Sequence, residues 1–222
     1  MKVLITGITG FVGSHLAEYI IRLKDEHEVY GMCRWRSPKE NLADIYDKVS
    51  LIDADLLDLG GLIRCLEKSK PDAIFHLAAQ SYVVTSFGDP VQTVTTNVIG
   101  TLNLLEAIRI LKIDPVVHIC SSSEVYGQVA EKDIPIKEDC PFRPASPYAV
   151  SKVGEDMIAL QYWLSYKIRT IRTRMFTHTG PKRGDVFAMS FFAKQIAAGE
   201  LGLSDKVIKV GNLKSVRTFC DV

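Results

Sequence analysis

Short, unbroken apolar runs alternate along this chain of 222 residues with longer segments that have helical periodicity. Apolar runs without polar alternation are typical of strands covered on both faces, and helical segments between such runs indicate parallel strands. The pattern predicts strands at residues 2–6, 29–33, 49–54, 73–79, 116–121 and 168–176. It predicts helices at residues 11–23, 56–68, 90–111, 146–166 and 186–199.

The repeated order of strand, helix and strand indicates an α/β fold class, a Rossmann-like doubly wound parallel sheet. No linker or internal repeat interrupts this order. Residues 127–147 carry four prolines in a charged setting, which predicts a long surface loop of the kind that borders a site. Residues 207–222 are expected to form a strand and a loop.

The composition is that of one ordinary globular domain, with a net charge of +1, 47% hydrophobic residues and 24% charged residues. This balance gives no support to nucleic-acid binding. Basic residues cluster locally at Arg34 to Lys39 and at Lys182 to Arg183, and both clusters are too short for a nucleic-acid stripe. Small anionic ligands suit them better.

The five cysteines are widely spaced and form no CxxC pair or Cys/His group, so no metal site is expected and a reduced, cytoplasmic protein is the simplest interpretation. The N-terminal residues MKVLITG lead directly into the first expected strand and not into the apolar region of a signal peptide. No apolar stretch approaches the roughly 18 residues of a membrane span. We therefore expect neither secretion nor membrane attachment.

Three glycines follow the first expected strand directly and open the first helix, where backbone amides can face a pyrophosphate. A tight turn without a ligand would need the same glycines, but their position in the first strand–helix–strand unit favours a dinucleotide site. The residues expected to line this site are Gly7, Thr9, Gly10, Phe11, Val12 and Gly13.

The end of the second expected strand reads MCRWRS and contains Arg34 and Arg36 but no acidic residue. An acidic residue at this position pairs with a ribose 2′-hydroxyl, whereas a basic residue pairs with a 2′-phosphate. NADP is therefore the expected cofactor. Solvated surface arginines are the alternative.

Two later strand ends also suit a bound nucleotide. Asp55 and Leu56 follow the third expected strand, where the adenine would lie, and small residues that admit a close backbone approach end the fourth. A buried turn of small residues would have the same sequence pattern. The interpretation as a nucleotide site therefore depends on the order of these segments along the chain. The residues of the fourth strand end are Leu77, Ala78, Ala79 and Ser81.

Tyr148 and Lys152 are spaced i, i+4 in SPYAVSK, which places both on one face of the expected helix. A tyrosine with a pKa near 10 is a poor base, but a neighbouring ammonium and an oxidised nicotinamide both favour its phenolate. A tyrosine packed beside a surface lysine has the same spacing. The upstream strand that ends in serines, and the glycine turn, favour a catalytic pair.

The stretch SSSEVYG at residues 121–127 ends the fifth expected strand with three hydroxyls and the carboxylate of Glu124. A carboxylate so close to a buried strand is costly unless its charge is used. Asn97 lies within the expected helix 90–111, where Asn and Gly are poor helix formers. A backbone distortion near the site and a plain helix-surface asparagine are both compatible with it.

Several motifs together resemble the nucleotide-sugar branch of the extended short-chain dehydrogenases/reductases, the NAD-dependent epimerase/dehydratase family, and within it most resemble the GDP-mannose 4,6-dehydratases. These motifs are TGITGFVGSHL, HLAAQSYVVTSF, NVIGTLNLLEAIR, SSSEVYG, RPASPYAVSK, RMFTHTGPKRGDVF and VGNLKSVRTF. The resemblance implies an NADP-binding Rossmann domain at residues 1–176. It implies that residues 177–222 begin a substrate-binding portion that is only partly present, in a chain truncated at its C-terminus.

The resemblance also implies roles for individual residues. Ser122 would bond the sugar 4-hydroxyl, Glu124 would be the active-site base, and Tyr148 with Lys152 would be the redox pair. The family pattern assigns His178 and Arg183 to the cofactor, and Ser86, Thr177 and Arg217 to the substrate. Thr177 stands where the family usually has Asn, and Thr218 where it usually has Asp. His178 could equally be a structural histidine, and Arg217 an ordinary exposed arginine.

The implied activity is conversion of GDP-mannose to GDP-4-keto-6-deoxy-mannose, with internal hydride transfer through NADP, which makes the protein a lyase. A GDP-4-keto-6-deoxy-mannose reductase, or another nucleotide-sugar epimerase or reductase, is the first alternative, because such enzymes can carry the same Ser-Glu pair. A non-catalytic NADP-binding module is the second alternative. Relatives form dimers or tetramers, so a homo-oligomer is expected.

Overall fold

The computed structural model describes residues 1–222 and divides into two units, Met1–Met175 and Phe176–Val222. None of the helices combines the length and the apolar character that crossing a membrane requires.

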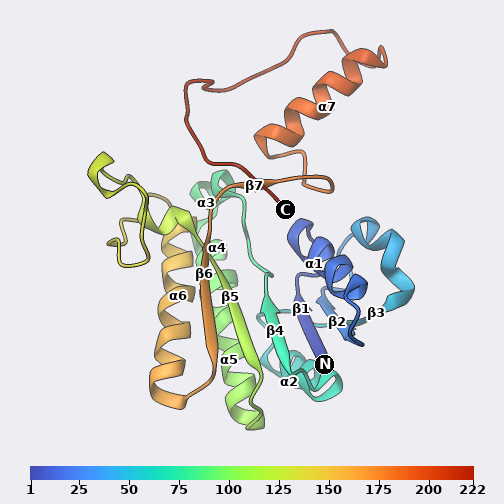
Figure 1. The fold of residues 1–222 in the computed structure, drawn as a ribbon, viewed down its shortest axis with the longest axis vertical. Coiled ribbons are helices and arrows are strands. Elements are labelled where there is room, and N and C mark those ends of the chain that lie inside the picture. Colours follow the sequence, from blue (N-terminus) through green and yellow to red (C-terminus); the bar gives the residue numbers. More distant parts are fainter. The chain divides into compact units, whose positions relative to one another are not determined.

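The first unit is built on a six-stranded parallel sheet with the strand order β3-β2-β1-β4-β5-β6 (Figure 1). This order is that of the doubly wound Rossmann fold, so the predicted fold class is confirmed. Each of the six strands expected in this part of the chain is present. They are β1 (Lys2–Thr6), β2 (Glu28–Cys33), β3 (Val49–Asp53), β4 (Ala73–His76), β5 (Val116–Ser122) and β6 (Thr170–Met175).

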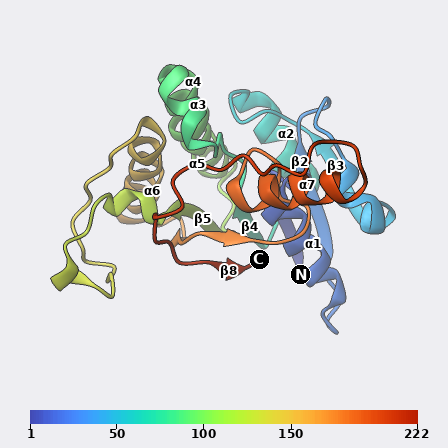
Figure 2. The same ribbon diagram turned by 90° about the horizontal axis from the view of Figure 1, so that it is seen from above.

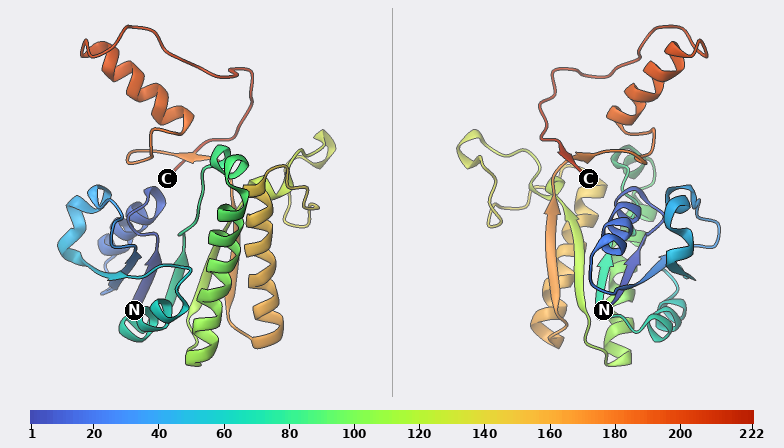
Figure 3. Two further views of the ribbon diagram at one scale, coloured as in Figure 1. Left: turned by 180° about the vertical axis from the view of Figure 1, so that it is seen from behind. Right: turned by 45° about the vertical axis from the view of Figure 1, so that its right-hand side comes forward.

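Helices cover both faces of this sheet (Figure 2). They bury two apolar clusters against it. On one face, α1 (Phe11–Arg22) and the 3-10 segment η1 (Glu40–Lys48) pack on β1 and β2. On the other, α2 (Leu59–Ser69), α5 (Gly100–Leu111) and α6 (Pro147–Tyr166) form the larger cluster with residues of five strands. α5 and α6 lie side by side there (Figure 3). The unbroken apolar character of the strands follows from this burial on both faces.

The expected helix 90–111 is divided into three segments. α4 (Pro90–Val94) and α5 are joined by a π-helical turn, Thr95–Ile99, which contains Asn97. Because Asn97 is completely buried, the interpretation as a helix-surface asparagine is wrong, and the distortion is present. The short helix α3 (Val83–Gly88) precedes α4 and has no clear sequence pattern of its own.

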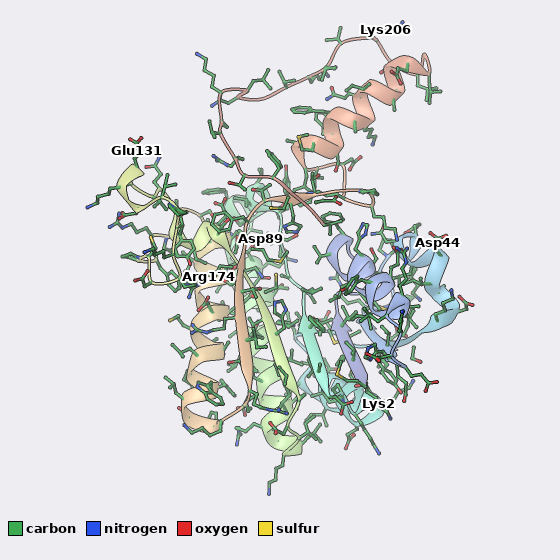
Figure 4. All side chains as sticks on the ribbon, in the orientation of Figure 1. Lys2, Asp44, Asp89, Glu131, Arg174 and Lys206 are labelled. Carbon is green, nitrogen blue, oxygen red and sulfur yellow. The ribbon has the colours of Figure 1, made fainter.

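The expected loop at 127–147 is present, with two short 3-10 turns, η3 (Ser123–Tyr126) just before it and η4 (Glu131–Asp133) within it. Arg174 of β6 anchors the loop, because its guanidinium donates to the hydroxyl of Tyr126 and to the carbonyl of Glu138 (Figure 4). The same guanidinium lies 4.6 Å from the centroid of the Phe142 ring. Gly127 has φ +59°, and a Cβ there would lie 1.9 Å from the carbonyl oxygen of Arg143. The chain can therefore turn into the loop at this point only with glycine.

The second unit contains α7 (Ala188–Glu200) and two short parallel strands, β7 (His178–Thr179) and β8 (Cys220–Asp221). The helix expected at 186–199 is therefore present. The strand expected within residues 207–222 is reduced to the two residues of β8, because residues 207–219 are exposed and have no strand partner.

Candidate active site

The carboxyl ends of all six parallel strands lie along one edge of the sheet, and the order of the strands changes direction between β1 and β4. Doubly wound folds bind their ligands at such a switch point, because the loops that follow the two strands diverge there. The expected glycine turn follows β1, and the expected small-residue stretch 77–81 follows β4. The structure therefore brings these two segments together.

The glycine turn is packed so tightly that side chains would not fit. Gly7 has φ +71°, and a Cβ there would lie 2.9 Å from the backbone of Ala78. A Cβ on Gly13 would lie 2.4 Å from the carbonyl oxygen of Gly7. Gly10 is the N-cap of α1, with no side-chain cap and no acidic residue in the first turn. The positive end of the helix dipole thus faces a turn without carboxylates, which suits an anion.

A buried histidine connects the glycine turn to the helix layer. The hydroxyl of Thr6 accepts hydrogen bonds from the amides of Leu77 and Ala78, both at 3.1 Å, and lies 2.9 Å from Nδ1 of His76. Nε2 of His76 lies 3.0 Å from the hydroxyl of Thr101, which donates to the carbonyl of Asn97. Every donor and acceptor in this set has a hydrogen-bond partner if the Thr6 hydroxyl donates to Nδ1 and a neutral imidazole donates from Nε2 to the Thr101 hydroxyl.

Burial lowers the pKa of His76 to about 3, with a further contribution from the charge of Lys152. His76 is therefore neutral at physiological pH, as the hydrogen-bond pattern requires. This role of His76 has no signal in the sequence, because the pairs Thr6–His76 and His76–Thr101 are far apart in the chain and follow no local pattern.

Asn97 is the second residue that makes several hydrogen bonds in this buried network. Its side-chain amide forms two hydrogen bonds with the backbone of Gln80, at 2.8 and 3.0 Å, and donates to the hydroxyl of Ser151 at 2.8 Å. Ser151 in turn donates to the carbonyl of Tyr148. The π-helical turn thus joins the end of β4 to the first turn of α6, which carries Tyr148.

α6 begins at Pro147, and its N-cap Ser146 accepts a hydrogen bond from the amide of Ala149. This start places Tyr148 in the first turn and Lys152 one turn later, on one face, as the spacing predicts. Nζ of Lys152 lies 6.0 Å from the centroid of the Tyr148 ring, and both side chains are buried. The alternative interpretation, a tyrosine packed beside a surface lysine, is therefore wrong.

Tyr148 is close to Ser122 at the end of β5. Burial raises the pKa of Tyr148, whereas the charge of Lys152 and a hydrogen bond with Ser122 lower it. The lowering expected from Lys152 is present, but burial outweighs it in this protein. Ser122 also accepts a hydrogen bond from the amide of Glu124 and so caps the 3-10 turn η3.

Glu124 is exposed, although it lies two residues after a buried strand end. The expectation of a costly buried carboxylate is therefore wrong, because the 3-10 turn that follows β5 directs this side chain to solvent. The carboxylate is available to a ligand at the carboxyl edge of the sheet.

The residues expected near the adenosine part of a cofactor lie after β2 and β3. Arg34 and Arg36 are exposed, and the guanidinium of Arg36 lies 4.4 Å from the centroid of the Trp35 ring, within cation–π distance. Leu56 is buried against Gly100 of α5, and its carbonyl accepts a hydrogen bond from the Asn103 side chain. Asp55 accepts a hydrogen bond from the amide of Leu57.

Ser86 is buried in α3, where its hydroxyl donates to the carbonyl of Val83 at 2.6 Å. This geometry satisfies Ser86 within the protein and gives no support to a substrate contact.

The remaining expected residues belong to the second unit. Nδ1 of His178 lies 2.9 Å from the carbonyl of Phe176, as in a structural histidine, and the Thr177 carbonyl accepts from the amide of Cys220. The guanidinium of Arg183 lies 4.2 Å from the Phe187 ring centroid, and burial lowers its pKa. Arg217 is exposed and donates to the carbonyl of the adjacent Val216.

A Rossmann sheet, a glycine turn at its switch point and a buried Tyr-Lys pair beside a serine at the end of β5 define a nucleotide-binding protein of the epimerase and dehydratase type. A family model described as GDP-mannose 4,6 dehydratase matches residues 4–222. The chain belongs to this family.

Named relatives agree with this membership. The GDP-6-deoxy-D-mannose reductase of Pseudomonas aeruginosa is 36% identical, over 100% of this chain and 66% of that protein. The GDP-mannose 4,6-dehydratase of Yersinia enterocolitica is 39% identical, over 98% of this chain and 60% of that protein. The chain thus spans less than two thirds of the length of either relative. The solved structure of RMD from Pseudomonas aeruginosa complexed with NADPH superposes with a TM-score of 0.83 at 33% identity, over 100% of this chain and 68% of that one.

The His76 network predicts a specific dependence of stability on pH. Because the pKa of His76 is about 3 in the folded state, against an ordinary value of 6.5, the unfolded chain binds a proton first as the pH falls. The free energy of unfolding should therefore decrease between about pH 6.5 and pH 3, by up to about 1.4 kcal/mol per pH unit from this group. Urea unfolding of H76Q should have a correspondingly shallower pH slope. Parallel slopes for the two proteins would contradict the assignment.

Proposed function

We propose that this chain carries the cofactor site and the catalytic residues of a GDP-mannose 4,6-dehydratase. The observation that carries the proposal is the convergence of Ser122, Tyr148 and Lys152 at the end of β5, with the exposed Glu124 two residues beyond Ser122. Family membership supports the nucleotide sugar as the class of substrate.

The residues at the switch point fit a dinucleotide. The glycine turn has a close backbone approach that side chains would block, and α1 presents its N-terminus beside it. Arg34 and Arg36 offer two exposed cations at the end of β2, which favours the 2′-phosphate of NADP over the hydroxyl of NAD. The similar RMD structure holds NADPH. We propose NADP as the cofactor.

In the proposed reaction, the Tyr148 phenolate removes the proton of the sugar 4-hydroxyl while Ser122 orients that hydroxyl and Lys152 stabilises the phenolate. The glycine turn would hold NADP, which would supply a reversible hydride acceptor for the oxidation at C4 and the reduction at C6. The 4-ketone acidifies the proton on C5, and the Glu124 carboxylate removes that proton and passes it to the 6-hydroxyl, which leaves as water. The proton that Tyr148 took from the 4-hydroxyl is returned to C5 as C6 is reduced. The products are GDP-4-keto-6-deoxy-mannose and water, and the cofactor ends unchanged.

A reductase is the second candidate, favoured by the 36% identity to the GDP-6-deoxy-D-mannose reductase. Reduction of a 4-ketone needs Tyr148 and Lys152 but no base for C5, so Glu124 distinguishes the two reactions. A non-catalytic NADP-binding module would have no need for the buried ammonium of Lys152, which is costly to maintain.

On the second unit, we propose that His178 and Arg183 contact the cofactor and that Thr177 and Arg217 contact the substrate. This proposal rests on the family pattern in THTGPKRG and VGNLKSVRTF.

We also propose that the protein forms a homo-oligomer. Val150, Met157 and Leu164 on α6 are all exposed, and their spacing of seven residues places them on one face of the helix. Val91 on the adjacent α4 is 75% exposed. Exposed apolar side chains in a row on neighbouring helices are typical of an interface between subunits.

The role of Glu124 predicts the outcome of replacing it. E124Q should lower the formation of the alkali-sensitive 4-keto product from GDP-mannose by about 100-fold or more, because the base for C5 is lost. The exposed Glu131, at the tip of the loop, provides the matched control, and E131Q should keep full activity. If E124Q eliminates water at the normal rate, Glu124 is not the base. NADPH oxidation by the wild-type protein on addition of the 4-keto-6-deoxy sugar, without turnover of GDP-mannose, would identify a reductase instead.

The arginines predict cofactor preference. R34A/R36A should weaken NADPH binding at least about tenfold, which corresponds to about 1.4 kcal/mol, and leave NADH binding nearly unchanged. R22A, on the exposed side of α1, is the control and should change neither affinity. Titration calorimetry with both nucleotides provides the measurement. Equal losses for both nucleotides would mean that the arginines do not recognise the 2′-phosphate.

The apolar row on α6 predicts the oligomeric state. M157K/L164K should shift the protein from a dimer or larger assembly to a monomer in light scattering after gel filtration, because two charges cannot be buried at the interface. I171K, on an exposed position of β6, should leave the assembly intact. A wild-type protein that is monomeric at micromolar concentration would refute the proposal.

A further inference from the structure

Glu155 is a buried carboxylate to which neither the motifs nor the proposed reaction gives a role. It lies on α6 one turn after Lys152, and it is 1% exposed. Its Oε2 accepts a hydrogen bond from Nζ of Lys152 at 2.9 Å, whereas its Oε1 is buried without a hydrogen-bond partner. Burying a carboxylate with half of its bonding capacity unused is costly, so a purely structural role is hard to sustain.

The adjacent Asp156 provides the contrast. It is also buried, but its two oxygens accept from Arg172 at 2.6 Å and from Arg174 at 2.8 Å. Two guanidinium groups from β6 thus compensate its charge and tie α6 to the sheet. Glu155 has no such pair of cations, and its single cationic partner is the lysine beside Tyr148.

The ionisable groups around Glu155 come from three elements. On α6 they are Lys152, Tyr148 and Asp156, and on β5 the thiol of Cys120 lies close to both Lys152 and Glu155. From β6, Arg172 and Arg174 are held by Asp156. Lys152 also donates to the carbonyl of Cys120 at 2.9 Å, so its ammonium is fixed between β5 and Glu155.

We propose that Glu155 is a positioning residue for the catalytic pair: it holds the Lys152 ammonium beneath Tyr148, keeps it charged in a buried site, and couples the acidity of Tyr148 to its own protonation. This inference rests on the proposed role of Tyr148 and Lys152, and it adds a third ionisable group to their proton balance.

The electrostatics of the three groups follow from this arrangement. Burial is the largest influence on the pKa of Lys152 and would lower it, but the contributions of Glu155, Tyr148 and Cys120 together raise it, with that of Glu155 the largest of the three, so the ammonium persists at neutral pH. Burial raises the pKa of Glu155 to about 7, although Lys152 opposes this. Glu155 is thus the member of the group that changes charge near neutrality. When it is protonated, the charge of Lys152 is uncompensated and favours the phenolate of Tyr148; when it is ionised, it raises the pKa of Tyr148.

The direct test is the titration of Lys152, followed by NMR of protein labelled with ¹³C at lysine Cε, with the signal assigned by K152R. In E155Q the midpoint should fall by at least one pH unit relative to the wild-type protein, because the buried ammonium loses its counter-charge. Glu106 forms an ion pair of the same i, i+3 spacing with Arg109 on α5, so E106Q is the matched control and should leave the Lys152 titration unchanged. An unshifted Lys152 in a folded E155Q would overturn the inference.

A second readout needs no variant that could fail to fold. In the wild-type protein labelled at the glutamate carboxyl carbon, one carboxyl signal should titrate near pH 7 and shift when NADP is added. A set of glutamates that all titrate near the ordinary value of about 4.3 would refute the coupling. These measurements require no turnover, so they separate failure of this inference from failure of the proposed dehydratase reaction. In an active protein, the inflection near pH 7 in the profile of kcat/KM should be absent from E155Q.

Discussion

The candidate site depends on one buried chain of hydrogen bonds that runs from the hydroxyl of Thr6 through His76 and Thr101 to Asn97. It joins the ends of β1 and β4 to the helix layer, and through Ser151 it reaches the backbone of Tyr148. A parallel sheet brings strand ends to one edge, but it does not by itself set the distance between a glycine turn and a helix on the opposite side of the switch point. This chain of neutral groups sets that distance, and every member is satisfied without any charge being buried.

The fold could largely be predicted from the sequence. The six strands of the first unit are short apolar runs bounded by polar residues, and burial on both faces gives such runs a local signal. The glycine turn and the Tyr148–Lys152 spacing were also predictable, because each is a pattern within a few residues. Departures occurred where tertiary contacts outweigh local preference. The π-helical turn at Asn97 exists because its side chain serves Gln80 and Ser151, and Glu124 is exposed because a 3-10 turn capped by Ser122 follows the strand.

The parts of the site that sequence reasoning missed are pairs of residues from distant segments. His76 with Thr6, and Arg174 with Tyr126, have no spacing that a sequence pattern could detect. Glu155 is different, since it lies three residues from Lys152. Its role could not be predicted, because Glu and Lys at this spacing usually form exposed pairs on a helix surface. Only the burial of this face of α6 makes the pair costly, since two charges are then removed from water.

The anchoring of Arg174 has a consequence for how the chain leaves the sheet. Arg174 is the second-last residue of the first unit, and its guanidinium is held by Asp156 from α6 and by the 127–147 loop. Strand ends commonly fray, yet this one is clamped on two sides up to one residue before the boundary. The backbone at this end of β6 is therefore held by side chains of two other segments of the first unit, as the interior of a strand is held by its neighbours.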